Sequence, residues 1–179
     1  KRFLLIKGII LNIRPKKSGT AYKKIWWKEG SPLVVISERF TKKVIKKIDI
    51  PVELAMRYGS MSMNQGIDNL IKKGVTEIFL APLYPHYAMS SYETVVTQAE
   101  EILSEKYPHV KLDTLPPFYN KPDYIKAMSD NIAKHIKGFD YDHILFSYHG
   151  IPERHIKKSD PTKSHSKLDN SCCERNSVA

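Results

Sequence analysis

The residues best suited to do chemistry in this chain are a histidine and the apolar run before it, Leu145-Phe146-Ser147-Tyr148-His149-Gly150-Ile151-Pro152. The run predicts a buried strand over residues 143–148, and the glycine and proline that follow stop any regular continuation. His149 is therefore expected at the exit of a strand. In open α/β sheets ligands bind at the carboxyl ends of the strands, so this imidazole is a candidate for proton transfer or metal binding.

Two other predicted strands are also followed by polar and aromatic side chains. These side chains are Arg57 and Tyr58 after residues 52–56, and Tyr84, His86 and Tyr87 after residues 75–80. In a parallel sheet all three strand ends lie at one edge, where a pocket forms. An arginine offers a fork of donors to an acidic group, and tyrosines offer flat amphipathic surface. With two imidazoles, the set suits a flat, aromatic, acidic ligand together with a borderline metal such as Fe²⁺.

Each of these residues also has a structural interpretation. Arg57 could pair with a neighbouring carboxylate, His86 could be an ordinary loop residue, and Tyr84 and Tyr87 could serve packing alone. His149 could be a lone strand-end histidine. A Ser-His hydrolase based on Ser147 and His149 is not favoured, because the chain has no G-x-S-x-G elbow. Three further histidines are interpreted as ordinary surface residues, and they are His143, His155 and His165.

Strands and helices are predicted to alternate from residue 33 onward. The expected strands cover residues 33–36, 52–56, 75–80, 110–115 and 143–148. Capping boxes at Ser62/Gln65 and Ser90/Glu93 predict two helix starts, Asn120 predicts a third, and Gly74 and Gly138 predict helix ends. This alternation is typical of βαβ units, so the fold class is α/β with an open parallel sheet flanked by helices. Residues 152–179 are polar, and the unit that begins near Tyr141 looks incomplete.

Composition excludes several classes of protein. The 179 residues are 41% hydrophobic and 27% charged, which is ordinary for a globular domain. No apolar run is long enough to span a membrane, no signal peptide is recognisable, and a cytoplasmic location is expected. The only cysteines, Cys172 and Cys173, are adjacent and form no C-x-x-C motif. The net charge of +10 comes from scattered lysine pairs, which favours a solvated surface over a nucleic-acid face.

Several motifs in order along the chain resemble those of the ferrochelatase family. They are Arg14-Pro15-Lys16-Lys17-Ser18, Ile25-Trp26, Gly30-Ser31-Pro32-Leu33, Met56-Arg57-Tyr58-Gly59, Pro82-Leu83-Tyr84-Pro85-His86-Tyr87-Ala88, Ser147-Tyr148-His149-Gly150-Ile151-Pro152-Glu153-Arg154-His155 and Lys158-Ser159-Asp160-Pro161-Thr162. The resemblance implies two similar Rossmann-like, chelatase-type α/β domains with a porphyrin cleft between them. It implies insertion of Fe²⁺ into protoporphyrin IX in haem biosynthesis.

The resemblance also implies residue roles. His149 matches the catalytic histidine that accepts a pyrrole proton or handles the metal. Arg57 and Tyr58 are expected to line the cleft, and Arg14 and Ser31 to lie near the porphyrin propionates. His86 matches a loop histidine that some members place near the metal, so His149 and His86 are the expected metal-side residues. The resemblance further implies that iron is the substrate, and that the macrocycle is bent so that the pyrrole lone pairs face the incoming iron.

The chain also departs from the family pattern. Residues 1–139 are expected to form the N-terminal domain without the family's first strand and glycine loop, and residues 140–179 to begin a second, truncated domain. The carboxylate that faces the histidine in the family is not found in this chain. Met89 and Ser166 stand where some members have cysteines, so no iron–sulfur cluster is expected.

These departures leave several outcomes open. The chain alone is expected to be inactive. Alternatives are a non-catalytic porphyrin- or haem-binding fragment, completed by a separate C-terminal chain, and a degraded gene product. Peripheral association with the inner membrane surface is a further expectation, and nucleic acid is not an expected partner.

Overall fold

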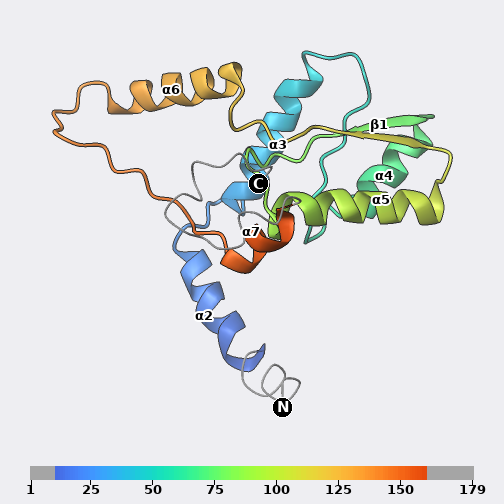
Figure 1. Cartoon of the computed structure of the whole chain (residues 1–179), viewed down its shortest axis with the longest axis horizontal. Coiled ribbons are helices and arrows are strands. Elements are labelled where there is room, and N and C mark those ends of the chain that lie inside the picture. Colours follow the sequence, from blue (N-terminus) through green and yellow to red (C-terminus); the bar gives the residue numbers. More distant parts are fainter. Residues whose placement is uncertain (1–10, 161–179) are drawn as a thin grey trace. The chain divides into compact units, whose positions relative to one another are not determined.

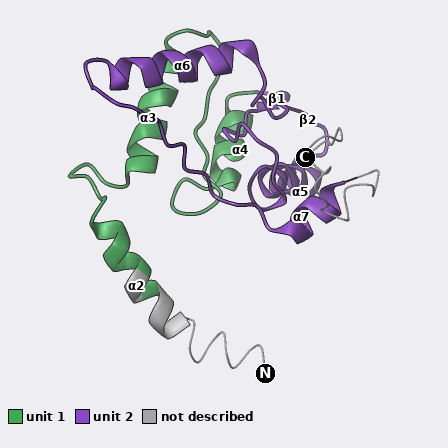
Figure 2. Ribbon diagram, turned by 60° about the vertical axis from the view of Figure 1, so that its left-hand side comes forward, with its two compact units in different colours: residues 1–74 green, residues 75–179 purple. Residues whose placement is uncertain are grey.

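The computed structural model describes residues 11–160 (Figure 1). The chain divides into two compact units, unit 1 with residues 1–74 and unit 2 with residues 75–179 (Figure 2). Among the described residues, no helix is long and apolar enough to cross a membrane. His165, Ser166, Cys172 and Cys173 lie outside the described residues.

The described part of unit 1 contains three helices, α2 (Leu11–Lys23), α3 (Pro32–Ile45) and α4 (Met63–Lys72). A tight turn precedes α3, in which Trp27 and Gly30 exchange backbone hydrogen bonds of 3.0 and 3.2 Å. Gly30 adopts a φ of 128°, which side-chain-bearing residues rarely reach. Helix α4 begins as predicted, because the Ser62 hydroxyl accepts a hydrogen bond from the Gln65 N–H at 3.2 Å. Gly74 follows α4 with a φ of 79°, also as predicted.

The predicted strand at residues 33–36 is wrong, because these residues form the first turn of α3. Ser31 occupies the N-cap and Pro32 the first helical position, where a proline ring is already set for helix geometry. A four-residue apolar run fits a buried strand or a helix face equally well, and here the helix-start signals decide the outcome.

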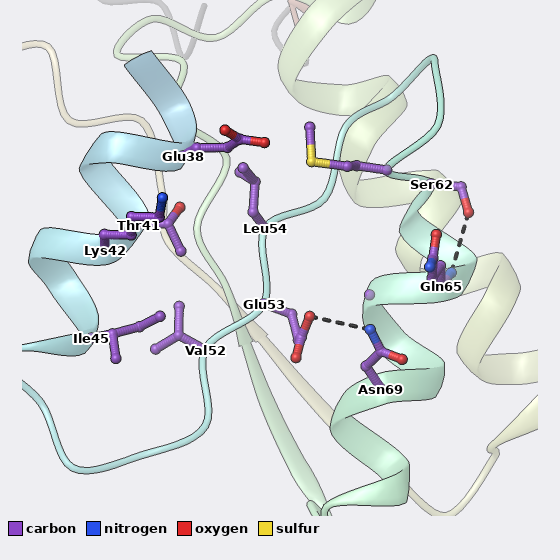
Figure 3. A pocket seen from close by; sticks show the side chains of 12 residues that line it. Glu38, Thr41, Lys42, Ile45, Val52, Glu53, Leu54, Ser62, Gln65 and Asn69 are labelled. Carbon is purple, nitrogen blue, oxygen red and sulfur yellow. Dashed lines mark hydrogen bonds between the residues drawn. The ribbon is translucent and has the colours of Figure 1, made fainter. Parts of the chain in front are cut away.

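Residues 52–56 are extended between α3 and α4, but only Met56 forms a β-bridge, a parallel one with Ser62. Their side chains alternate as in a strand. Val52 and Leu54 point toward α3, whereas Glu53 points toward α4 (Figure 3). The predicted strand is therefore present in conformation, while its pairing is limited to one residue.

Unit 2 is built around a parallel two-stranded sheet, β1 (Glu77–Leu80) and β2 (Lys111–Thr114). Glu77 pairs with Lys111 and Leu80 with Thr114, so the strands are in register over their full length. The connection between them is η2 (Met89–Glu93), a π-helical turn, followed by α5 (Thr94–Lys106). This βαβ unit confirms the predicted α/β class at the two strands and the helix between them.

The core of unit 2 lies on one face of α5. Its buried side chains recur at helical spacing, and they are Val95, Ala99, Ile102 and Leu103. Ile78 of β1 and Val110, just before β2, are also buried. Helix α6 (Pro122–Ile136) begins after Lys121 rather than at the predicted cap Asn120, and Gly138 follows its end with a φ of 85°.

Two further predictions in unit 2 are wrong. Ser90 does not cap a helix, because it lies inside η2, whose N-cap is Ala88. Residues 143–148 form no strand, and every residue from 141 to 150 is exposed, with Leu145 at 92%. A strand is held by hydrogen bonds to a neighbour, and no described strand lies beside this segment. The segment is followed by α7 (Glu153–Ser159).

Replacing Ile102 by Ala should destabilise the chain by about 2–5 kcal/mol, because truncating a buried side chain loses apolar burial and leaves a cavity. Ile102 is 7% exposed. The matched control is Ile125→Ala on α6, where the isoleucine is 53% exposed. The control should change the free energy of unfolding by no more than about 0.5 kcal/mol. Urea denaturation followed by circular dichroism measures both values, and equal effects would contradict the assignment of the core to α5.

Candidate site at the sheet edge of unit 2

The loops that follow β1 and β2 meet at one edge of the sheet. The ladder continues one step past the strands, since Leu115 N–H donates to Leu80 C=O at 2.8 Å. Beyond it, Phe118 N–H and Tyr119 N–H both donate to Pro85 C=O at 2.9 Å. The loop with Tyr84, His86 and Tyr87 is therefore joined by its backbone to the segment after β2, as parallel strands require.

His86 lies exposed on this joined edge. Its imidazole stacks on the Tyr119 ring, with centroids 5.1 Å apart and planes 14° from parallel. Within the described chain, neither ring nitrogen of His86 makes a hydrogen bond. The stack fixes the plane of the imidazole while its nitrogens stay available to a ligand, as an exposed metal-side or proton-accepting residue requires.

Tyr87 and Tyr92 use their hydroxyls inside the protein. Tyr87 Oη donates to Glu93 Oε2 at 2.8 Å, and Tyr92 Oη donates to Leu115 C=O at 3.0 Å. Burial, with the Glu93 carboxylate as a second cause, raises the pKa of Tyr87 to about 12. Burial also raises the pKa of Tyr92 above its ordinary value. Of the open alternatives for Tyr87, the structure therefore favours a packing role.

His149 lies in the exposed segment before α7. Its Nδ1 is 2.6 Å from the Gly150 carbonyl oxygen. A carbonyl oxygen can only accept, so we assign the ring proton to Nδ1, which leaves the lone pair of a neutral imidazole on Nε2. Nε2 is then the atom that could take a proton or bind a metal ion. Within the described residues, His149 makes no hydrogen bond or ring contact with His86.

Arg57 and Tyr58 are neighbours in a turn of unit 1. Met56 N–H donates to Met61 C=O at 2.7 Å, and Gly59 within the turn has a φ of 100°. The Arg57 guanidinium carbon lies 5.1 Å from the centroid of the Tyr58 ring, a cation–π distance. Tyr58 is 81% exposed, whereas Arg57 is half-buried. The pair presents a flat ring next to a positive charge at the surface of unit 1.

Ser31 and Arg14 also belong to unit 1. Ser31 is the N-cap of α3, where its carbonyl accepts from Val35 N–H at 3.0 Å. Its hydroxyl makes no capping hydrogen bond, so this group stays available to a ligand. Arg14 lies in α2. The predicted site residues are thus divided between Arg14, Ser31, Arg57 and Tyr58 in unit 1 and His86 and His149 in unit 2.

A cavity of about 430 Å³ in unit 1 was not predicted from the sequence (Figure 3). It lies between α3, residues 52–54 and the first turns of α4. Glu53 accepts from Lys73 Nζ at 2.6 Å and from Asn69 Nδ2 at 3.3 Å. The hydrogen bond from Lys73 lowers the pKa of Glu53, and burial opposes it. The sequence signal that could have indicated this cavity is Glu53, a single carboxylate inside the apolar run 52–56. Its hydrogen bonds to Lys73 and Asn69 indicate a structural role.

Glu93 is a second residue that the sequence interpretation misassigned. It was predicted to close a capping box with Ser90, but its carboxylate accepts from Tyr87 instead. Within the described residues, no three His, Cys, Asp or Glu side chains gather as metal ligands.

Comparison with known proteins decides the family. The sequence matches the model of the family described as ferrochelatase over residues 2–173. The chain belongs to the ferrochelatase family. It is 44% identical over 176 residues to a ferrochelatase of Pseudomonas fluorescens (strain Pf0-1), covering 98% of this chain and 51% of the relative. It is also 44% identical over 172 residues to a ferrochelatase of Stutzerimonas stutzeri (strain A1501), covering 96% and 50% respectively.

The chain spans about half the length of the curated relatives it matches. No solved structure matches it. The predicted family and α/β class are confirmed, and the parallel pair β1–β2 with its helices is consistent with a chelatase-type domain. The predicted domain boundary between residues 139 and 140 stays a prediction, as do the roles of the six site residues.

Proposed function

We propose that this chain takes part in ferrochelatase chemistry, the insertion of Fe²⁺ into protoporphyrin IX in haem biosynthesis. One observation carries the proposal: the family match extends over residues 2–173, with relatives named ferrochelatase that are 44% identical. A haem-biosynthetic enzyme of this family takes ferrous iron as a substrate, and protoporphyrin IX is the partner that its cleft receives.

The reaction involves no change of oxidation state. Two pyrrole N–H protons leave the macrocycle, and four Fe–N bonds form as Fe²⁺ enters. In our proposal, His149 accepts a pyrrole proton at Nε2, because Nδ1–H is engaged with the Gly150 carbonyl. Alternatively, His149 could handle the metal. His86 is proposed on the metal side because its nitrogens have no partner in the part of the chain that the structure describes.

The other site residues are proposed to bind the macrocycle. Arg57 offers hydrogen bonds and charge to an acidic porphyrin, and Tyr58 offers a flat, exposed face. Ser31 can donate its hydroxyl proton to a propionate, since no cap bond uses it. Arg14 is proposed at the propionates as well. Bending of the macrocycle by such contacts costs about 1–5 kcal/mol, which binding of the rest of the porphyrin supplies.

A second candidate function follows from the chain spanning about half of its relatives. A polypeptide of these 179 residues alone is proposed to bind porphyrin without turnover, with a complementing chain supplying the rest of the cleft. Cytoplasmic location, association with a membrane surface and the expected lack of an iron–sulfur cluster stay predictions.

An anaerobic assay with protoporphyrin IX and Fe²⁺ tests the proposal. A full-length protein that carries this sequence should form haem, measured by its absorbance, because both sides of the cleft are then present. The 179-residue chain should quench porphyrin fluorescence on binding and form no haem. Turnover by the 179-residue chain would overturn its predicted inactivity. A full-length protein that folds and binds porphyrin but makes no haem would overturn the proposed function.

A further inference from the structure

Glu93 has no role in the proposed reaction, yet its carboxylate holds a tyrosine of the loop that carries His86. Tyr87 Oη donates to Glu93 Oε2 at 2.8 Å. The π-helical turn η2 makes this contact geometrically possible. Glu93 N–H donates to Ala88 C=O at 3.3 Å, five residues back, and this wide turn returns Glu93 toward Tyr87. We refer to this hydrogen bond as the Tyr87–Glu93 contact.

The surroundings of the contact keep it in one state. A phenol hydroxyl is protonated at neutral pH, so Tyr87 Oη donates to the Glu93 carboxylate throughout the neutral range. The Tyr87 ring also packs against Tyr92, with centroids 5.8 Å apart. Tyr92 in turn donates to Leu115 C=O, just after β2. Tyr87 is therefore anchored both to the start of α5 and to the end of the second strand.

His86 lies between two residues that are each held in place. On one side, Pro85 C=O accepts from Phe118 N–H and Tyr119 N–H. On the other side, Tyr87 is held by Glu93. Among residues 11–160, the His86 ring itself has only the stack on Tyr119 to orient it. Its orientation therefore depends on the two neighbouring anchors, and one of them is a single side-chain hydrogen bond.

We propose that Glu93 is a positioning residue, which acts through Tyr87 to hold the His86 imidazole against Tyr119 at the carboxyl end of the sheet. Any effect of Glu93 on iron insertion rests on the proposed function. The positioning of His86 by Glu93 does not depend on it. A ligand for this site would bind an exposed imidazole nitrogen of His86, as a divalent metal ion or a proton donor does.

The test compares Glu93→Ala and Glu93→Gln in the 179-residue chain by NMR of the histidine ring protons. The His86 ring-proton signal is identified as the one lost in His86→Gln. Its upfield shift is attributed to the ring current of Tyr119 if Tyr119→Leu removes that shift. Glu93→Ala should remove most of this shift, because Tyr87 loses its acceptor. Glu93→Gln should keep it, because the amide oxygen can still accept from the phenol. Tyr87→Phe, which keeps the ring, should behave like Glu93→Ala.

Tyrosine ultraviolet titration gives a second, independent measurement. In both Glu93 variants the pKa of Tyr87 should fall below about 12, because the carboxylate is lost, while burial, the larger cause, keeps it above the ordinary value. The matched control is Glu100→Ala, an exposed glutamate on α5 without a described partner. It should change neither measurement, and circular dichroism confirms that each variant is folded.

An unchanged His86 shift in folded Glu93→Ala and Tyr87→Phe would overturn the proposal. Loss of the shift in the control as well would also overturn it, because the effect would then be general loosening of α5. The proposed metal-side role of His86 fails separately. If a full-length protein loses the His86 shift through Glu93→Ala but forms haem at an unchanged rate, His86 has no metal-side role although Glu93 still positions it.

Discussion

A full-length protein that carries this sequence should lose most of its iron-insertion rate when His149 is replaced by Ala. The expected fall in kcat is about 10²–10⁴-fold, the range that a positioned proton acceptor contributes. Nε2 carries the lone pair in our assignment, and alanine offers no atom to take its place. The KM for porphyrin should change little, because an exposed imidazole contributes more to proton transfer than to binding the macrocycle. Haem absorbance under anaerobic conditions measures both constants.

Two comparisons separate proton transfer from a structural role of His149. His143→Ala removes another exposed imidazole from the same segment and should leave kcat unchanged. Imidazole added to the solution should restore part of the rate of His149→Ala, since a free base can occupy the emptied space. Full activity in His149→Ala would remove His149 from the mechanism. Equal losses in His143→Ala would point to general disruption of the segment.

The second large effect is expected at Arg57. In the same full-length protein, Arg57→Ala should raise the Kd for protoporphyrin about 10–100-fold, because a hydrogen bond to a charged group is worth about 1.5–3 kcal/mol. Arg57→Lys should recover part of the loss, since it keeps the charge but not the planar fork. Porphyrin fluorescence titration measures each Kd.

The matched control for Arg57 is Arg39→Ala. The Arg39 guanidinium is already engaged with Glu29, with Nη2 2.8 Å from Oε1 and 2.7 Å from Oε2, and lies 5.7 Å from the Trp27 ring centroid. Its loss should leave the porphyrin Kd unchanged. A porphyrin with esterified propionates should bind wild type and Arg57→Ala with similar affinity, because it offers no carboxylate to the arginine. An unchanged Kd for the free acid in Arg57→Ala would exclude Arg57 from the porphyrin site.

Local signals predicted the elements whose partners lie close in the sequence. Ser62 and Gln65 fixed the start of α4, and Gly74 and Gly138 were correctly placed beyond helix ends. The strands β1 and β2 were predicted because each apolar run is bounded by turn residues, and the helix between them lets the two runs pair in parallel. The parallel pairing also brings the loops after β1 and β2 together at the carboxyl ends of the two strands.

The failures have physical causes that a local pattern does not contain. Leu33 to Ile36 could have been a strand or a helix face, and Pro32 at the helix start decided between them. Residues 143–148 have a strand-like pattern, but backbone pairing depends on a neighbour that the pattern does not specify. Glu93 fitted a capping box, yet Tyr87 captured its carboxylate across a π-helical turn. Among the candidate residues, the Tyr87 hydroxyl is engaged with Glu93 whereas the Ser31 hydroxyl makes no capping bond, a difference that residue type alone does not contain.

The exposed segment before His149 has a consequence for solutions of this chain. Ile144 to Tyr148 holds two branched side chains, two aromatic side chains and one serine, with no charge and no proline, and it is exposed along its whole length. Such runs pair with copies of themselves in intermolecular β-structure. Asp142 and His143 before the run and His149 and Gly150 after it provide little charge to oppose this association. Self-association through this segment is therefore expected to increase with the concentration of the chain, without prior unfolding.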